Sequence, residues 1–274
     1  MNKIIIDANK HKLFPNLKIL YNYKDLFVTL TWRDFRVRYA QTKIGLLWAL
    51  LQPVSTLAIL TLVFNKFAGV ETQVPYILFA VAGTSIWTYF SYVITNSGNS
   101  LISNQNMIKK IYFPRIIIPL SKAVVGFVDY GITLLIMIAL MFYYQITPSS
   151  NIIYAPIFIL IAIIAALAVG IWLSALTIRF RDFQHVIPFM VQIGLYITPI
   201  AYPIELVSKN LPIWAQSIYF LNPMAGVVQG FRWSIFGGEP LTGLFYLSFF
   251  VIIILFISAL MYFNKVEKNM ADLI

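Results

Sequence analysis

Residues 130–178 read YGITLLIMIALMFYYQITPSSNIIYAPIFILIAIIAALAVGIWLSALTI, and these 49 positions include no Asp, Glu, Lys or Arg. A helix needs about 20 apolar residues to cross the roughly 30 Å hydrocarbon core of a bilayer. The run is therefore long enough for two crossings. The turn-forming cluster Thr147-Pro148-Ser149-Ser150-Asn151 divides it, so these residues predict a pair of consecutive membrane-spanning helices.

Similar charge-free runs at 44–65, 72–108, 183–204 and 240–264 predict the remaining spans. The expected helices are about 46–66, 74–96, 116–143, 152–177, 186–203 and 242–263. The composition agrees, because 60% of the residues are hydrophobic and only 11% are charged, whereas soluble domains have about 25% charged residues. The sequence thus predicts an all-α integral membrane protein with six transmembrane helices and excludes a soluble enzyme. The chain has no cysteine, which excludes disulfides and Cys-ligated zinc.

The distribution of Lys and Arg sets the expected orientation. Seventeen of the 20 lie in the two termini and in the loops at 97–122 and 178–185, whereas the opposite loops hold only Lys66, Lys209 and Arg232. Cytoplasmic loops of membrane proteins carry this excess, so both termini are expected in the cytoplasm. The net charge of +10 therefore reports orientation in the membrane and does not indicate a nucleic-acid partner.

Motifs for catalysis are missing. The chain has no G-x-x-x-x-G-K-[ST] loop to hold ATP, no H-E-x-x-H and no G-x-S-x-G, so we expect neither an enzyme nor a bound metal or cofactor. Asp129 is the one acidic residue inside a predicted span. A charge there is costly and functional by default. It either pairs with Lys122, two turns away, or with a hydroxyl, or else it handles substrate or protons.

The regions outside the spans divide the chain into a cytoplasmic N-terminal region, 1–45, and a transmembrane domain, 46–274. Basic and aromatic residues alternate at 23–43, which predicts a short helix lying at the membrane interface. The loops at 97–115 and 179–183 are basic, and they either dock a soluble partner or merely satisfy the charge asymmetry.

The segment 204–241 predicts short helices on the outer side. Asn222 is a good N-cap before Pro223, and Gly237-Gly238 ends the helix after fourteen residues, too few to span. We expect a re-entrant pair that either gates a pathway or forms a static hairpin.

Uncharged polar residues recur at helical spacing on three predicted helices, for example Gln52, Thr88 and Tyr196. Hydroxyls, amides and aromatic rings suit sugars, and they equally suit hydrogen bonds between helices in lipid. Small residues recur every fourth position at Ala162, Ala166, Gly170 and Ser174. This ladder predicts close helix packing, within the chain or between subunits.

Four ordered blocks together resemble one known family, the ABC-2-type permeases that export polysaccharides. The blocks are TWRDFRVRYAQTKIGLLWALLQP at 31–53, KIYFPR at 110–115 with PLS at 119–121, RFRD at 179–182 through TPIAYP at 198–203, and LNPMAGVVQGFR at 221–232. The nearest group is the membrane subunit of O-antigen exporters, with teichoic-acid and capsule exporters as near relatives.

The resemblance implies a homodimer of six-helix subunits that binds two cytoplasmic ATPase subunits and secretes a lipid-linked polysaccharide from the cytoplasm to the periplasm across the bacterial inner membrane. ATP and Mg²⁺ would bind in the partner, with no cofactor in this chain. It also implies an interface helix at 23–40, a coupling helix near 99–113 and periplasmic gate helices within 204–236. Two alternatives stay open, an ABC-2 exporter of small molecules or drugs and a membrane scaffold that transports nothing.

Candidate site residues follow from the polar stripes and this resemblance. The channel-lining candidates are Trp48, Gln52, Thr88, Ser91, Tyr92 and Tyr196. The candidates for coupling to the ATPase are Asn104, Lys109, Lys110, Tyr112, Arg179, Arg181 and Asp182. The candidates for the periplasmic gate are Asn222, Pro223, Val227 and Phe231.

Overall fold

A computed structural model describes residues 17–40, 45–238, 241, 243–268 and 270. This described part of the chain is helical and contains no strand, which confirms the all-α class. Five of its helical segments have the length and composition of a membrane span. They are Ala49–Phe67, Tyr76–Gly98, Ile117–Tyr143, Ser150–Arg179 and Phe245–Glu267.

The five spans match the predicted helices to within a few residues at most ends. They are built from α3 (Gly45–Leu60) with the π-helix η2 (Thr61–Phe67), α4 (Tyr76–Gly98), α7 (Ile117–Tyr143), the 3-10 turn η3 (Ser150–Tyr154) with α8 (Ala155–Arg179), and α13 (Phe245–Glu267). The other elements are α1 (Leu17–Asn22), α2 (Lys24–Phe35), the π-helix η1 (Arg36–Ala40), α5 (Ser100–Ser103), α6 (Gln105–Lys110), α9 (Phe183–Ile197), α10 (Ile204–Asn210), α11 (Ile213–Tyr219) and α12 (Pro223–Phe236).

The predicted span at 186–203 differs from the structure at its second end. Helix α9 stops at Ile197, and Thr198 has an extended backbone with ψ 141°. The cause is Pro199, because the ring of a proline disfavours the helical conformation of the residue before it. The 15 residues of α9 extend about 22 Å at ~1.5 Å per residue, which is short of the roughly 30 Å hydrocarbon core.

Helix α4 is the centre of the subunit. In the most apolar stretch of α4, 78% of the residues are buried, whereas the corresponding value in the other four spans is 17–33%. It packs against α7, α8 and α12. The small-residue ladder of α8 faces it, because a Cβ added to Gly170 would lie 2.8 Å from the Cβ of Ser97. The ladder therefore packs within the chain, as one of the two predicted alternatives had it.

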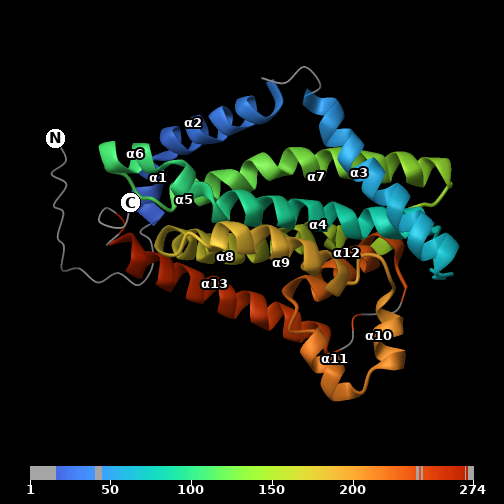
Figure 1. Cartoon of the computed structure of the whole chain (residues 1–274). Helices are drawn as coiled ribbons and strands as arrows, with labels where there is room; N and C mark the ends of the chain where they lie inside the picture. The colour runs from blue at the N-terminus through green and yellow to red at the C-terminus, as the bar shows by residue number, and fades with distance from the viewer. Residues whose placement is uncertain (1–16, 41–44, 239–240, 242, 269, 271–274) are drawn as a thin grey trace.

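The long helices run between two ends with different contents (Figure 1). Helices α1, α5 and α6 gather at one end, with the C-terminus, and the α10–α11 hairpin lies at the other. Helix α12 packs against α4, α8 and α13. Its predicted limits are confirmed, since Asn222 Oδ1 accepts a hydrogen bond from Met224 N at 3.0 Å and Gly237 ends the helix with φ 76°.

Helices α2 and α3 flank this bundle. Helix α2 lies against α7, and it confirms that part of 23–43 is helical. Helix α3 crosses obliquely over α4 and α7 in Figure 1, and only 17% of its span is buried. Much of α3 therefore faces away from its own subunit.

Candidate functional site

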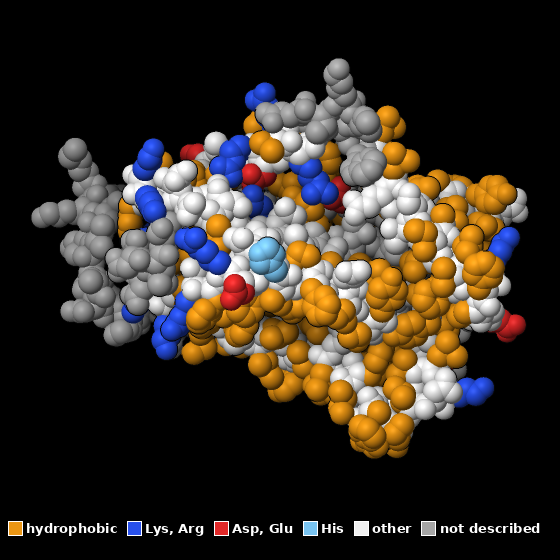
Figure 2. Space-filling model, viewed as in Figure 1, with side chains coloured by type: hydrophobic (Ala, Val, Ile, Leu, Met, Phe, Trp, Pro, Cys, Tyr) orange, Lys and Arg blue, Asp and Glu red, His pale blue; other side chains and the backbone are white. Residues whose placement is uncertain are grey.

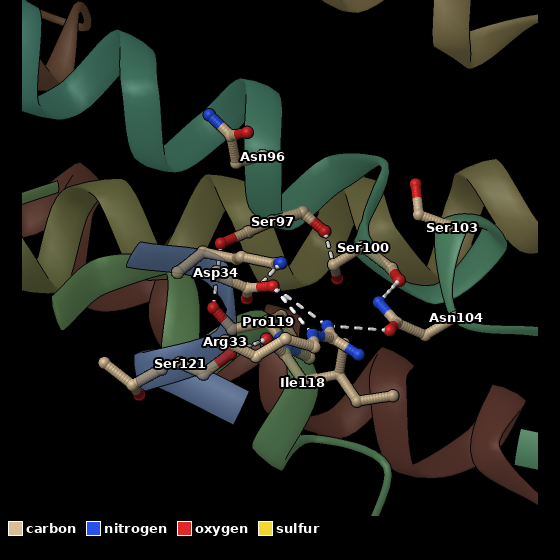
Figure 3. A network of polar contacts seen from close by, with 12 residues as sticks. Arg33, Asp34, Asn96, Ser97, Ser100, Ser103, Asn104, Ile118, Pro119 and Ser121 are labelled. Atoms are coloured by element: carbon tan, nitrogen blue, oxygen red, sulfur yellow. Dashed lines mark hydrogen bonds and ion pairs between the residues drawn. The ribbon is translucent and has the colours of Figure 1, made fainter. Parts of the chain in front are cut away.

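A polar network joins the end of α2 to the segment that follows α4 (Figure 3). Arg33 donates from Nη2 to Asn104 Oδ1 at 2.9 Å and also binds Asp34 at 2.9 Å. Asp34 in turn pairs with Lys122 of α7. Three parts of the chain, α2, the α5–α6 junction and α7, are thus held by one chain of charged and amide groups.

The same network continues through the backbone at the end of α4. Asn104 Nδ2 donates to Ser100 O at 2.8 Å, and Ser97 Oγ donates to Pro119 O at 2.9 Å. These bonds fix the turn between α4 and α6 against the start of α7 (Figure 3). Asn104, the residue before α6, is thus bonded both to α2 through Arg33 and to α5 through Ser100.

Asp129 lies deeper along α7 and is 6% exposed. Its Oδ2 pairs with Arg38 Nη2 at 2.5 Å, and its Oδ1 accepts from the Tyr39 hydroxyl at 2.7 Å. The guanidinium of Arg38 also lies 4.3 Å from the centroid of the Tyr92 ring. Burial, together with the hydrogen bond to Asp129, raises the pKa of Tyr39, so the phenol stays a donor.

The expected pairing of Asp129 with Lys122 is wrong, whereas the expected hydroxyl partner is present. Two helical turns separate the two residues by about 11 Å along the axis, too far for direct contact. Each residue instead forms an ion pair with the segment that packs against α7: Lys122 pairs with Asp34 of α2, and Asp129 pairs with Arg38 of η1. A carboxylate held by a cation and a phenol is well suited to anchoring η1, and this geometry favours a structural role.

Arg232, which the sequence analysis counts among the few charges outside the spans on the outer side, is buried on α12. It is 4% exposed and donates to Phe79 O at 3.1 Å, Pro199 O at 2.5 Å and Ile200 O at 2.6 Å. Gly83 leaves the space it occupies, since an added Cβ there would lie 2.4 Å from Nη2. One side chain thus ties α12 to α4 and to the bend after α9. In the sequence, the one feature that points to this role of Arg232 is that it is an isolated cation in an apolar stretch.

Residues 25–236 match the family model described as ABC-2 type transporter. This segment runs from α2 to the end of α12 and includes Arg33, Asp129 and Arg232. The chain belongs to the ABC-2 type transporter family. It is a multi-pass membrane protein.

Named relatives agree with the resemblance seen in the sequence. This permease is 31% identical over 267 residues to an O-antigen export system permease protein, RfbA, of Klebsiella pneumoniae, covering 94% of this chain and 100% of the relative. It is 25% identical over 215 residues to a protein of the same name from Myxococcus xanthus, covering 78% and 81%. It is 23% identical over 247 residues to the polysialic acid transport protein KpsM of Escherichia coli, covering 88% and 93%.

The coupling candidates of this ABC-2 permease gather at one end of the molecule. Asn104 is buried in the network, whereas Lys109, Lys110 and Tyr112 on and after α6 are exposed. Arg179 is the last residue of α8, which packs against α5, and Arg181 and Asp182 follow it; all three are exposed too. Lys and Arg side chains are frequent at this end in Figure 2.

Arg115 is a contact at this end that the sequence did not reveal. Its backbone N–H donates to Glu267 Oε1 at 2.7 Å, and its Nη1 donates to Glu267 O at 2.6 Å. The loop after α6 is thereby joined to the end of α13.

The lining candidates do not share one environment. Gln52 on α3 and Tyr196 on α9 are exposed, Tyr196 to 59%. Thr88 and Ser91 are half-buried on α4, whereas Tyr92 is 9% exposed and packs against Arg38. The Trp48 side chain lies outside the described residues. Among the described members of this set, Gln52 and Tyr196 are therefore the two exposed residues.

The gate candidates on α12 are mostly enclosed. Val227 and Phe231 are 0% and 1% exposed, and Asn222 and Pro223 are half-buried at the start of the helix. Asn222 caps the helix and also donates to Thr198 Oγ1 at 3.0 Å. The bond between Asn222 and Thr198 joins the start of α12 to the residue that follows α9.

Proposed function

We propose that this chain is the channel-forming membrane subunit of an ATP-driven exporter of lipid-linked polysaccharide of the O-antigen class. The observation that carries the proposal is the similarity to O-antigen export permeases over 94% of this chain and the full length of the relative. In this proposal two copies form the channel, and a polysaccharide passes from the cytoplasm to the periplasm across the bacterial inner membrane.

The proposed topology has six crossings with both termini in the cytoplasm. The excess of Lys and Arg at the end with α1, α5 and α6 supports that orientation. The short helix α9 would complete its crossing through the non-helical residues after Ile197, which lead into α10 (Figure 1). Such non-helical backbone at membrane depth must be enclosed by protein or line a cavity, and Arg232 binds the carbonyls of Pro199 and Ile200 there.

The proposed path lies along the faces of α3 and α9 that expose Gln52 and Tyr196 among apolar side chains. Gln52 and Tyr196 offer an amide and an amphipathic ring without a fixed charge, which suits the hydroxyl edges and apolar faces of sugars. A repeating glycan has to move through the channel one repeat at a time. Weak, uncharged contacts do not hold any one repeat tightly, so they do not slow the next step. Thr88 and Ser91 complete the proposed lining, with Trp48 and Tyr92 as the remaining candidates from the sequence.

Two cytoplasmic ATPase subunits would bind ATP and Mg²⁺ and dock at the basic end. The exposed residues Lys109, Lys110 and Tyr112 of the α6 segment, with Arg179, Arg181 and Asp182, are the proposed contacts. Asn104 would not touch the partner but would pass its movement to α2 through Arg33. At the far end, α12 would frame the exit, with Asn222, Pro223, Val227 and Phe231 holding it in place.

Deletion of the gene tests the proposal. Lipid-linked glycan should accumulate on the cytoplasmic side of the inner membrane, and reintroducing this chain with its ATPase should restore glycan on the cell surface. Normal surface glycan in a deletion strain without a second exporter would contradict the substrate, and resistance to drugs that depends on the gene would favour a small-molecule exporter.

A further inference from the structure

Helix α11 exposes an apolar face to its surroundings. Ile213, Trp214 and Ile218 are 77%, 69% and 60% exposed, and Leu211 and Leu221 flank them at 40% and 48%. Figure 2 shows hydrophobic side chains gathered at the lowest point of the view, where Figure 1 places α11. Large exposed apolar patches mark surfaces that bind a partner or a membrane.

The opposite face of the hairpin is fixed to the beginning of α13. Phe220 is 1% exposed, and its ring lies 4.7 Å from that of Phe245, centroid to centroid. Ser248 Oγ donates to Phe220 O at 2.7 Å, and Ile204 and Val207 of α10 pack into the same cluster. The exposed face of α11 is therefore held in one orientation, beside the first turn of a membrane-spanning helix.

The polar side chains Gln216 and Ser217 of α11 bond within the hairpin. Gln216 Nε2 donates to Ser208 O at 3.0 Å and to Leu211 O at 2.8 Å, and Ser217 Oγ donates to Ile213 O at 3.0 Å. The charged residues of the hairpin, Glu205 and Lys209, are exposed on α10. One helix thus presents charge while the other presents an apolar face with a tryptophan, so the hairpin as a whole divides charge from apolar surface as the two faces of an interfacial helix do.

We propose that α11 lies in the headgroup–acyl boundary of the leaflet at this end of the molecule, with Ile213, Trp214 and Ile218 inserted among lipids. The surface continues onto the span, where Tyr246, Phe250 and Ile253 of α13 are 65%, 60% and 56% exposed. The depth of α11 in the membrane agrees with this position, because α11 lies beside the first turn of α13, which begins at Phe245. Tryptophan also favours the boundary between headgroups and acyl chains. The seven residues of α11 extend about 11 Å, so the helix anchors at the surface and does not cross.

The lipid anchor requires only that the chain spans a membrane, and it is independent of the exported substrate. It would hold the hairpin, and with it the end of α9 and the start of α12, at a constant depth. Tyr202 and Tyr219 support this link, since their hydroxyls lie 3.1 Å apart and Tyr202 also bonds to Ile197 O at 3.0 Å.

Single-cysteine labelling tests the anchor directly, because the chain has no native cysteine. Ile213→Cys and Ile218→Cys of the full chain, each carrying bimane, would be placed in lipid nanodiscs with Lys209→Cys as the matched control on α10. Nitroxide-labelled phospholipid should quench the two α11 probes several-fold more than the control probe, and aqueous iodide should quench the control several-fold more than the α11 probes.

Two results would overturn the proposal. Equal quenching of all three probes by iodide would place α11 in water. Protection of the α11 probes from both quenchers would mean that protein covers them, and a second copy of the chain would then be the occupant.

Discussion

At the scale of single residues, Arg232 has the most constrained surroundings. Its three nitrogens bind three backbone carbonyls in a site that excludes water. We expect Arg232→Ala to lower the free energy of unfolding by about 3–5 kcal/mol, because it leaves buried acceptors without donors. Thermal unfolding in detergent, followed by size-exclusion, measures this, with the exposed Arg36→Ala as control. Equal unfolding temperatures for the two variants would show that the carbonyl contacts do not hold α12.

A substitution at Asp129 distinguishes a structural role of this carboxylate from a role in proton handling. Asn keeps the shape and the acceptor for Tyr39 but removes the charge that pairs with Arg38. We expect Asp129→Asn to lower stability by about 1–3 kcal/mol while surface glycan stays near the wild-type level per folded molecule. Complete loss of export at unchanged stability would instead assign proton or substrate handling to this carboxylate.

At the scale of elements, the Asp34–Lys122 pair links α2 to α7. Asp34→Lys would place a third cation beside Arg33 and Lys122 and release α2. We expect export to fall several-fold while the ATPase stays bound, since the α6 surface is unchanged. The exchange Asp34→Lys with Lys122→Asp should recover part of the export, and Asp25→Lys, at the start of α2, serves as the control. If the exchange is no better than Asp34→Lys alone, the pair does not couple the two helices.

The contact between α8 and α4 gives a second prediction for elements. Gly170→Leu would force atoms into the space occupied by Ser97, and overpacking of this kind costs about 1–3 kcal/mol. Gly131→Leu on α7 is the matched control, because a Cβ there meets no atom within 4 Å. Unfolding temperature in detergent distinguishes them, and a loss for Gly131→Leu as large as for Gly170→Leu would contradict close packing as the cause.

The limits of the helices could be predicted from local chemistry. The contacts between distant helices could not be predicted in this way. The cap at Asn222 and the stop at Gly237 depend on neighbours in the sequence, so both were predicted correctly. The partners of Asp129 depend on where η1 lies against α7, and the three carbonyls around Arg232 come from α4 and the bend after α9. No periodicity in one sequence encodes such contacts between distant segments.

At the scale of the whole molecule, charged and apolar surfaces are separated, and this separation indicates what each exposed surface contacts in the proposed transporter. Most of the basic residues lie at one end and apolar surface covers much of the rest in Figure 2. Four exposed helices therefore have different proposed neighbours. Helix α13 and the tip of α11 would face lipid, whereas α3 and α9 would face the path and the second copy. This division makes the position of an exposed residue more informative than its type.

Tyr196 and Tyr246 provide the sharpest test of that division, because they are similarly exposed tyrosines, 59% and 65%, on α9 and α13. If α9 lines the path, Tyr196→Ala combined with Gln52→Ala should reduce surface glycan several-fold without loss of the ATPase from the purified complex. Tyr246→Ala should export like the wild type, because lipid tolerates a smaller side chain. Surface glycan in pulse-labelled cells measures both. Normal export by the α3–α9 double variant would move the path away from these faces, and a defect in Tyr246→Ala alone would place it beside α13.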